Sequence, residues 1–344
     1  LGGYVWKDHV IDRNFIMCER GECDFQQFIH NISGGTDERV NSMHSTIGYM
    51  LHGYKNLSYC PAVILNDEII SDNPEGGTGK GLFMKGLSEM KKLVVIDGKS
   101  FDFAKSFAYQ LVSADTQILC FDDVKKYFDF EKLFSVVTEG MTLEKKNKDA
   151  IKIPFSKSPK IAITTNYAIR GKGSSFERRK WELELSQHYT KEFTPLVEFG
   201  KHFFGEWDDD EWCQFDNFMI GCLQTYLEKG LLRSKFVNLE LRRLSAESSH
   251  EFIEWCGLLE NTTNPLLVLK EKTMTNALYF NFIEEYPDYG PKAKMSVTRQ
   301  RFHKWLEAYS QYKYNCPPLI GRDNEGKWME FVRKDHYNKQ FELL

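Results

Sequence analysis

The sequence lacks the features that mark membrane, secreted and zinc-binding proteins. None of its apolar runs is long enough to cross a bilayer, and its start, Leu1-Gly2-Gly3-Tyr4, has neither an initiating Met nor a signal-peptide pattern. Its eight cysteines are scattered, and the close pair Cys18 and Cys23 has no second pair at the spacing that a zinc site needs. We therefore expect reduced thiols in a cytoplasmic protein with no membrane partner, cut from a longer polypeptide.

A strong net charge is absent too. The formal net charge is −4 over 344 residues, so bulk charge does not indicate a nucleic-acid partner. A composition of 42% hydrophobic, 14% aromatic and 27% charged residues fits a globular protein of two or three domains. The cations are unevenly placed, however: between Met141 and Lys180 eleven Lys or Arg residues stand against three acids. This local excess of positive charge indicates an anionic partner for that region.

Residues 61–188 alternate apolar strands with helical segments, which predicts an α/β fold with a parallel sheet covered by helices on both faces. The expected strands are Ala62–Asn66, Leu93–Asp97, Gln117–Phe121, Lys160–Thr165 and Trp181–Leu185. The expected helices between them are Leu82–Met90, Phe103–Ser113 and Phe130–Glu139. In such folds ligands bind at the carboxyl ends of the strands.

A glycine-rich loop, Asn73–Phe83, follows the first expected strand. Backbone N–H groups and a helix N-terminus in this position hold nucleotide phosphates, and Lys80 would reach the β- and γ-phosphates. The match is imperfect, because Pro74 stands where a first glycine is usual and Gly81 where a Ser or Thr hydroxyl holds Mg²⁺. The loop alone leaves open a glycine-rich turn with a solvated lysine. The expected cofactor-binding residues are Gly76, Gly77, Thr78, Gly79, Lys80, Gly81 and Leu82.

Polar residues follow the third and fourth expected strands. Asp122 and Asp123 end the third strand, where phosphate-loop ATPases place a metal-binding acid and a base for the attacking water. Asn166 ends the fourth strand. In ATPases with an additional strand, the fourth strand lies between the first and the third, so Asn166 would hold the attacking water. Outside that geometry these residues are ordinary polar turns.

The basic region contains an expected hairpin and an arginine pair. The hairpin, Met141–Phe155, has a polar tip whose lysines suit phosphates, and its Phe155 could stack on a base. An arginine at a sheet margin, Arg178 or Arg179, can reach a neighbouring subunit's γ-phosphate. A solvated turn and two surface arginines are the plain alternatives. The DNA-binding residues expected in the hairpin are Lys145, Lys146, Lys148, Lys152 and Phe155.

The flanking regions are predicted to be mainly helical. Residues 1–60 form a helical region, and the acids Asp208–Glu211 open a helix at Trp212–Leu232 rather than bind a metal. After residue 236, a hairpin and three expected helices suggest a winged helix-turn-helix; the helices are Glu251–Leu259, Lys272–Glu285 and Ser296–Leu306. An exposed basic helix without a partner is the alternative there. The DNA-binding residues expected on its last helix are Arg299, Arg301 and Lys304.

The order of these parts resembles the superfamily three helicases, hexameric AAA+ ATPases of viruses, phages and mobile elements. It runs from the loop lysine Lys80 through the acids Asp122 and Asp123 and the hairpin to Asn166 and the arginine pair. The similarity is closest to the helicase part of poxvirus- and phage-type primase–helicases. It covers residues 43–235 and, more loosely, the basic module after them.

The resemblance implies an AAA+ P-loop sheet, ATP and Mg²⁺ as cofactors, and a ring, expected to be hexameric, that moves along single-stranded DNA. It makes Lys80 the phosphate-loop lysine, Asp122 the metal ligand, Asp123 the catalytic acid and Asn166 the sensor. One of Arg178 and Arg179 would be the trans finger. It implies a bacterial host cytoplasm or its equivalent, and a primase or polymerase domain on the same full-length chain. The expected domains are an N-terminal helical collar or oligomerisation region (1–60), an ATPase with a helical tail (61–235) and a winged-helix-like module (236–344).

Two other functions remain open. Pro74 and Gly81 permit a nucleotide-binding, ring-forming DNA-binding module whose ATPase is degenerate. A small-molecule phosphotransferase could use the same loop, but it would need neither the lysine hairpin nor the arginine pair. Phosphate release, its dependence on single-stranded DNA and the molar mass in solution separate the three.

Overall fold

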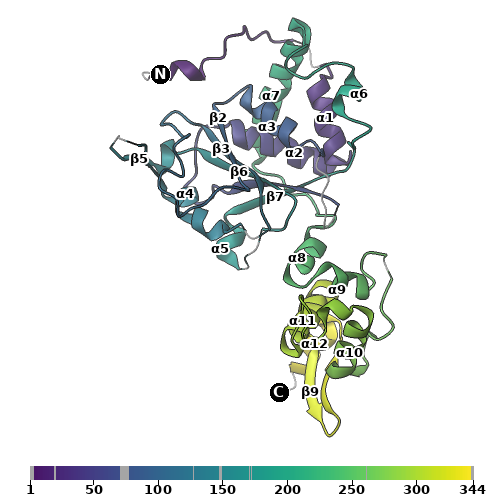
Figure 1. Ribbon diagram of the computed structural model, residues 1–344. Coiled ribbons are helices and arrows are strands. Elements are labelled where there is room, and N and C mark those ends of the chain that lie inside the picture. Colours follow the sequence, from purple (N-terminus) through teal and green to yellow (C-terminus); the bar gives the residue numbers. More distant parts are fainter. Residues whose placement is uncertain are drawn as a thin grey trace. The chain divides into compact units, whose positions relative to one another are not determined.

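The structure is a computed structural model that describes residues 4–18, 21–69, 77–126, 128–146, 149–169, 171, 173–260 and 262–341. It divides into two compact units, residues 1–238 and 239–344 (Figure 1). The helices that precede residue 60 belong to unit 1, and their expected role in oligomerisation stays a prediction. In the described part of the chain, no helix combines the length and apolar character needed to cross a membrane. All eight cysteines are free thiols.

Unit 1 is an α/β structure built on a five-stranded parallel sheet. Every expected strand is present, and the order across the sheet is β2-β3-β6-β1-β7. The fourth strand in chain order of this sheet, β6, therefore lies between the first and the third, as expected for an additional-strand arrangement. The strands are β1 (Ala62–Asp67), β2 (Leu93–Asp97), β3 (Ile118–Val124), β6 (Lys160–Thr165) and β7 (Lys180–Leu185).

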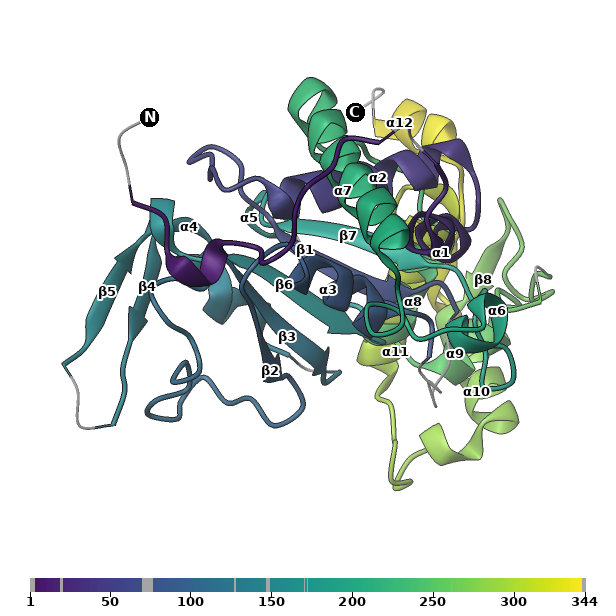
Figure 2. The same ribbon diagram turned by 90° about the horizontal axis from the view of Figure 1, so that it is seen from above.

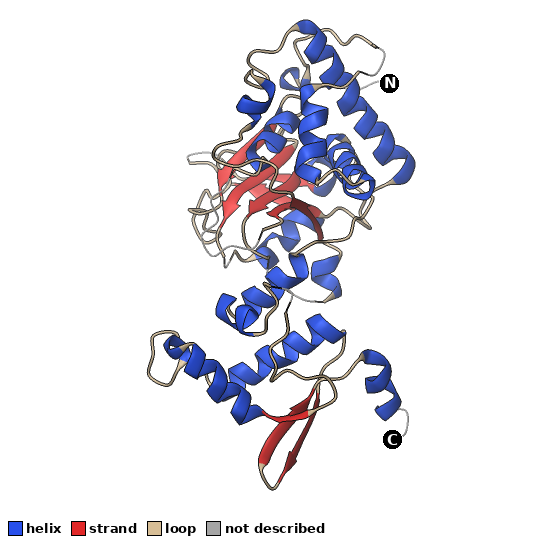
Figure 3. Ribbon diagram, turned by 90° about the vertical axis from the view of Figure 1, so that its right-hand side faces the viewer, coloured by secondary structure: helices blue, strands red, loops and turns tan. Residues whose placement is uncertain are grey.

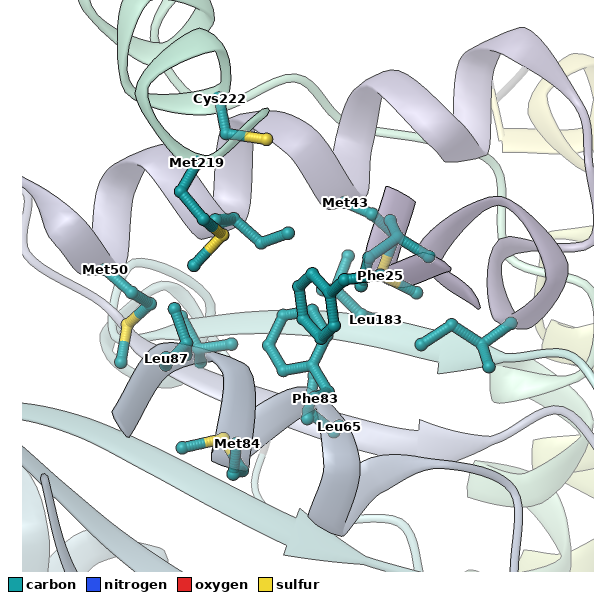
Figure 4. Packing of buried hydrophobic residues seen from close by; sticks show 14 of the residues in the cluster. Phe25, Met43, Met50, Leu65, Phe83, Met84, Leu87, Leu183, Met219 and Cys222 are labelled. Atoms are coloured by element: carbon teal, nitrogen blue, oxygen red, sulfur yellow. The ribbon is translucent and has the colours of Figure 1, made fainter. Parts of the chain in front are cut away.

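The parallel sheet has a hydrophobic core on each face. Successive residues of a strand belong to different cores, because side chains alternate between the faces of a sheet. Val63 and Leu65 of β1 join a core with Phe83, which a helical layer covers (Figure 4). Ala62 and Ile64 join the core of the opposite face. Burial on both faces explains why β1 reads as a continuous apolar run. The helices of the layer are α1 (Asp24–Ser33), α2 (Asp37–Leu51), α3 (Lys80–Ser88) and α7 (Asp209–Lys229).

The helical layer is held together by a close approach of α2 and α7. A Cβ added at Gly48 of α2 would collide with the Cys222 carbonyl of α7, so only glycine allows this spacing. At the start of α7, the Asp208 side chain accepts a hydrogen bond of 2.8 Å from the Glu211 N–H. The acids there cap the helix, as the sequence predicted. No cluster of three or more potential metal-ligating side chains occurs among the described residues.

One expected helix is wrong. Residues 103–113 form successive turns between β2 and β3 instead of a helix. Phe107 adopts a left-handed backbone conformation (φ 62°), which a right-handed helix cannot contain. Although Phe107 itself is exposed, Phe101 of this connection packs inward, and its ring lies 4.9 Å from that of Phe121 on β3. Tertiary packing of the aromatic rings thus overrides the local helical pattern.

The hairpin expected at Met141–Phe155 packs on the face of the sheet that contains Ala62 and Ile64. The expected helix at Phe130–Glu139 is divided into a 3₁₀ turn, η2 (Phe130–Leu133), and α4 (Phe134–Thr138). The strands β4 (Gly140–Leu143) and β5 (Ile151–Pro154) then pair antiparallel, and η3 (Phe155–Lys157) leads back to β6. Figure 2 shows this hairpin projecting away from the parallel sheet. Its tip residues Asn147 and Lys148 lie outside the described residues.

Shorter elements complete unit 1. A 3₁₀ turn, η1 (Lys7–His9), lies in the first described segment, and Arg13 of this segment forms an ion pair of 2.5 Å with Asp216 of α7. The helices α5 (Ser174–Glu177) and α6 (Pro195–Phe199) lie before and after β7.

Unit 2 combines helices with a three-stranded antiparallel sheet (Figure 3). Its helices are α8 (Leu239–Glu247), α9 (His250–Trp255), α10 (Thr275–Glu285), α11 (Arg299–Tyr314) and α12 (Lys334–Phe341), with the 3₁₀ turn η4 (Pro287–Tyr289). Its strands are β8 (Lys272–Met274), β9 (Leu319–Asp323) and β10 (Gly326–Glu330), in the order β8-β10-β9.

The core of unit 2 is aromatic. Phe252, Phe282 and Phe302 come from three different helices, and the rings of Phe282 and Phe302 stack with centroids 5.2 Å apart. The expected helix at Lys272–Glu285 begins only at Thr275, because the three residues before it pair with β10. Thr298 caps α11 by accepting the Arg301 N–H at 3.2 Å.

Candidate functional site

The candidate site lies at the carboxyl ends of β1, β3 and β6, where α3 begins. Lys80 is the first residue of α3, and its Nζ lies 2.5 Å from Asn166 Oδ1 after β6. These two residues are 86 positions apart, and the sequence had linked them only through the expected strand order. Gly79 caps the helix with φ 102°, and a Cβ there would lie 2.8 Å from the Phe28 ring. Gly76, also expected in this loop, lies outside the described residues.

Asp67, the last residue of β1, accepts hydrogen bonds from the side-chain donors of this loop. Its Oδ2 lies 2.6 Å from Lys80 Nζ, and its Oδ1 accepts a hydrogen bond from the Thr78 hydroxyl. A carboxylate thus rests where two donors of the loop converge, which fits donors arranged for an anion such as a phosphate. Asp67 is not among the site residues expected from the sequence. Its signal would have been an acid at the end of a buried strand that precedes a phosphate loop.

The paired acids are joined to β6 by one hydroxyl. Thr164 Oγ1 donates to Asp122 Oδ1 at 2.6 Å and accepts the Asp123 N–H at 2.7 Å. The pairing of β3 and β6 is irregular between Phe121 and Val124, and Asp123 has a left-handed φ of 53°. Such an irregularity re-aims side chains at the end of a strand. The Asp123 carboxylate contacts the Lys99 ammonium, and the side chain of Asp123 is 39% exposed.

The loop is suited to Mg²⁺ only in part. Asp122 is a half-buried carboxylate, and Mg²⁺ is commonly held by one or two carboxylates together with substrate phosphates and water. At Gly81 an added Cβ would meet no atom within 4 Å. The hydroxyl that a Ser or Thr would offer is therefore missing for lack of a side chain, and none of the described residues fills its place. The residues present fit a metal held mainly through Asp122 and the nucleotide.

The two arginines of the pair differ in their surroundings. The Arg179 guanidinium lies 4.4 Å from the centre of the Phe134 ring and donates to the Ser175 carbonyl at 2.9 Å. Partial burial, together with the neighbouring Arg178 charge, lowers the pKa of Arg179. Arg178 is exposed. Arg179 is thus held within its own chain, whereas Arg178 faces solvent.

The expected DNA-binding residues of the hairpin are the lysines of its arms and tip, and Phe155 at its base. Lys146 and Lys152 are exposed and Lys145 is half-buried, while Lys148 lies outside the described residues. Phe155 lies at the base of the hairpin, where Lys55 Nζ stands 4.3 Å from its ring centre. Stacking of Phe155 on a base stays a prediction, and it would compete with this contact.

In unit 2 the expected cations lie on the first turns of α11. Arg301 and Lys304 line a hollow of about 410 Å³ together with Glu247, Thr298, Gln300 and Trp305. Arg299 points elsewhere: its guanidinium lies 5.0 Å from the Phe280 ring centre. The three cations are exposed.

No protein-family model and no curated protein matches the chain. Among solved structures it is similar to two A-form apo structures of the C-terminal region of NrS-1. One is 12% identical, with 91% of this chain and 76% of that chain covered and a TM-score of 0.41. The other is 13% identical, with coverages of 90% and 76% and a TM-score of 0.41. Values of this size assign neither a fold family nor an activity.

Proposed function

We propose that unit 1 is the ATP-hydrolysing motor of a ring-forming DNA helicase from a replication protein, with an AAA+ P-loop fold. The contact between Lys80 Nζ and Asn166 Oδ1 carries this proposal. It joins the phosphate-loop lysine to the strand-end amide across a sheet in which β6 lies between β1 and β3. A turn lysine and a turn asparagine without a shared function have no reason to converge at this edge.

Each residue of the site then has a separate task. Lys80 binds phosphate oxygens, and Asn166 orients a water through its amide without adding charge. Asp122 holds Mg²⁺, which when bound neutralises charge on the transferred phosphoryl group. Asp123 accepts the proton of the attacking water. For that last step the Asp123 carboxylate has to leave its contact with Lys99.

Arg178 is our choice for the residue that acts on a neighbouring subunit. A trans-acting arginine must be free to cross an interface, and Arg178 is exposed whereas Arg179 is held by Phe134 and Ser175. Such residues contribute about 10³- to 10⁵-fold in rate. In the assembled ring, Arg178→Ala should therefore lower ATP turnover far more than Arg179→Ala does.

We further propose that DNA is bound by both units. The exposed lysines of the β4–β5 hairpin, Lys146 and Lys152, suit the phosphates of a single strand in a channel. Unit 2 has the element order of a winged helix-turn-helix, with β8 pairing to β10 beside the β9–β10 hairpin. Arg301 and Lys304 at the start of α11 would contact the phosphate backbone.

A second function is favoured by two observations. Gly81 offers no hydroxyl to Mg²⁺, and the Asp123 carboxylate is engaged by Lys99. Both would suit a nucleotide-binding, ring-forming module that does not turn ATP over. Nucleotide binding without phosphate release identifies this alternative.

The test is phosphate release measured with and without single-stranded DNA. We expect DNA to stimulate release, and we expect Lys80→Ala and Asp123→Ala to abolish it. Lys146→Ala should keep basal release and lose stimulation. Turnover that ignores single-stranded DNA would contradict the helicase proposal. A Gly81→Ser variant should need less Mg²⁺ for half-maximal turnover than the wild type.

A further inference from the structure

The Asp67 carboxylate accepts hydrogen bonds from two side-chain donors of the expected phosphate loop. Asp67 is only 6% exposed, and both of its carboxylate oxygens are bound by residues of the loop, one by Thr78 and one by Lys80. The side chains of Thr78 and Lys80 thus converge on an anion that belongs to the protein. The resemblance to the superfamily three helicases gives Asp67 no role.

A nucleotide phosphate cannot simply be added to this arrangement. Lys80 Nζ already contacts Asp67 Oδ2 at 2.6 Å and Asn166 Oδ1 at 2.5 Å. A phosphate oxygen at the same ammonium group would stand beside the Asp67 carboxylate, and like charges repel strongly in a buried setting. Binding is therefore an exchange in which one anion replaces another at Lys80 and Thr78.

The exchange also works in the other direction. When the phosphate leaves, Lys80 loses an anionic partner, and a half-buried ammonium is more stable beside another anion. The side chain of Lys80 is 12% exposed. Asp67, fixed at the end of the interior strand β1, offers that partner without a large movement of the chain.

We propose that Asp67 is an internal competitor for the phosphates of the nucleotide and speeds the release of the diphosphate product. The inference rests on the proposed nucleotide-binding function of the same site. Asp67 is a positioning residue in this role: it acts through Lys80 and Thr78. Its removal should tighten nucleotide binding, the reverse of what loss of an ordinary binding residue does.

The experiment is equilibrium and stopped-flow binding of a fluorescent ADP analogue, with Mg²⁺, to the full chain. For Asp67→Asn we expect about tenfold tighter binding, which corresponds to about 1.4 kcal/mol, with most of the change in slower dissociation. Glu68→Gln is the matched control, because it makes the same chemical change one residue on. The Glu68 carboxylate pairs with Arg39 at 2.7 Å, so its removal should leave ADP binding unchanged.

Lys80→Ala separates the two proposals. If Lys80→Ala binds the analogue as well as the wild type does, the proposed nucleotide site itself is wrong. If Lys80→Ala loses binding while Asp67→Asn binds equally or more weakly, the site stands and the competitor role is refuted. Weaker binding by Asp67→Asn that extra Mg²⁺ restores would make Asp67 a metal ligand, which also overturns the competitor role.

Melting temperatures give a readout that does not depend on turnover. Without nucleotide, Asp67→Asn should melt below the wild type, because the ion pair between Lys80 and Asp67 is lost. Saturating ADP should raise the melting temperature of Asp67→Asn more than that of the wild type, and an equal rise would count against the exchange. If Asp67→Asn does not fold, Asp67→Ser removes the same carboxylate, keeps a small polar side chain and should shift ADP binding in the same direction.

Discussion

The two ends of the parallel sheet both bury lysines but partner them differently. At the carboxyl end, Lys80 Nζ lies 2.6 Å from the Asp67 carboxylate. At the amino end, Lys160 is the first residue of β6, and it donates to the carbonyls of Tyr49 and, at 2.7 Å, of His52. Its ammonium also lies 3.9 Å from the centre of the Tyr49 ring. Lys160 thus caps the carboxyl terminus of α2.

Lys55 belongs to the same amino-terminal end. It donates to the Ser158 hydroxyl at 2.7 Å and faces the Phe155 ring. Within the part of the chain that the structure describes, neither Lys55 nor Lys160 has an acidic partner. Burial lowers the pKa of Lys160 to about 7 and that of Lys55 to about 8. Carbonyls and aromatic rings tolerate a neutral amine, whereas an anion-binding site needs a cation. We therefore infer a structural role for the lysines at the amino end of the sheet and a role in ligand exchange for Lys80 at the carboxyl end.

The largest expected effect contrasts Lys80 with Lys160 in turnover. Lys80→Ala should lower ATP hydrolysis by at least about 10²-fold, because one preorganised donor to the transferred phosphate is lost. Lys160→Met should retain hydrolysis in the folded protein. Lys85→Ala is the control on the same helix, since its ion pair with Glu89 lies at the surface. Steady-state phosphate release measures all three, and a similar loss in Lys160→Met would break the comparison.

The next effect is on stability. Lys160→Met keeps the length of the side chain but leaves two carbonyls at the end of α2 without their donor. We expect a loss of about 2–3 kcal/mol in the free energy of unfolding, from two buried groups that become unsatisfied. Urea denaturation gives the value, and the exposed Lys157→Met is the matched control. Equal stabilities of the two variants would show that solvent can satisfy the end of α2.

The pH dependence of stability has a definite sign. The pKa of Lys160 is about 7 in the folded protein and 10.5 in a model peptide, so between these values the unfolded chain binds more protons. Stability should therefore rise as the pH increases from 7 toward 10, by up to about 1.4 kcal/mol per pH unit. Below pH 7 both states are protonated and the effect ends.

Lys160→Met should flatten that rise, measured by urea denaturation at pH 7, 8 and 9. A rise that persists unchanged would assign it to other groups of this end. The titratable groups that face or surround Lys160 are Lys55, Lys91, Cys60, Tyr49 and His52.

The contrast also explains what could be predicted from the sequence. The strands could be predicted because β1 and β6 are apolar runs buried on both faces, and Lys80 could be predicted because its loop has a local pattern. The strand order placed Asn166 near Lys80 correctly. Each of these inferences needs only a short stretch of chain and a general rule for parallel sheets.

The rest depended on contacts between distant segments. Asp67 reads as the polar end of a strand until the loop folds back and Thr78 and Lys80 reach it. The turns at residues 103–113 depend on where Phe101 finds the Phe121 ring. Lys160 reads as one more cation of the basic region and Lys55 as an ordinary lysine before the first strand. Only burial separates them from the exposed lysines of the hairpin.

The smallest effect tests whether the amino-terminal end supports the hairpin. Lys55→Met removes the hydrogen bond to Ser158 and the contact with the Phe155 ring, both at the base of the β4–β5 hairpin. One hydrogen bond and one cation–π contact give an expected loss of about 1–2 kcal/mol. Limited proteolysis should show faster cleavage between residues 140 and 157 in Lys55→Met than in Lys126→Met, a control at an exposed lysine outside the hairpin. Because the hairpin returns directly into β6 and Asn166, a loosened base should also weaken the stimulation of hydrolysis by DNA, with basal hydrolysis unchanged. If cleavage is unaltered, the lysines of the amino-terminal end serve only α2, and the coupling of the hairpin to the site must run through β6 alone.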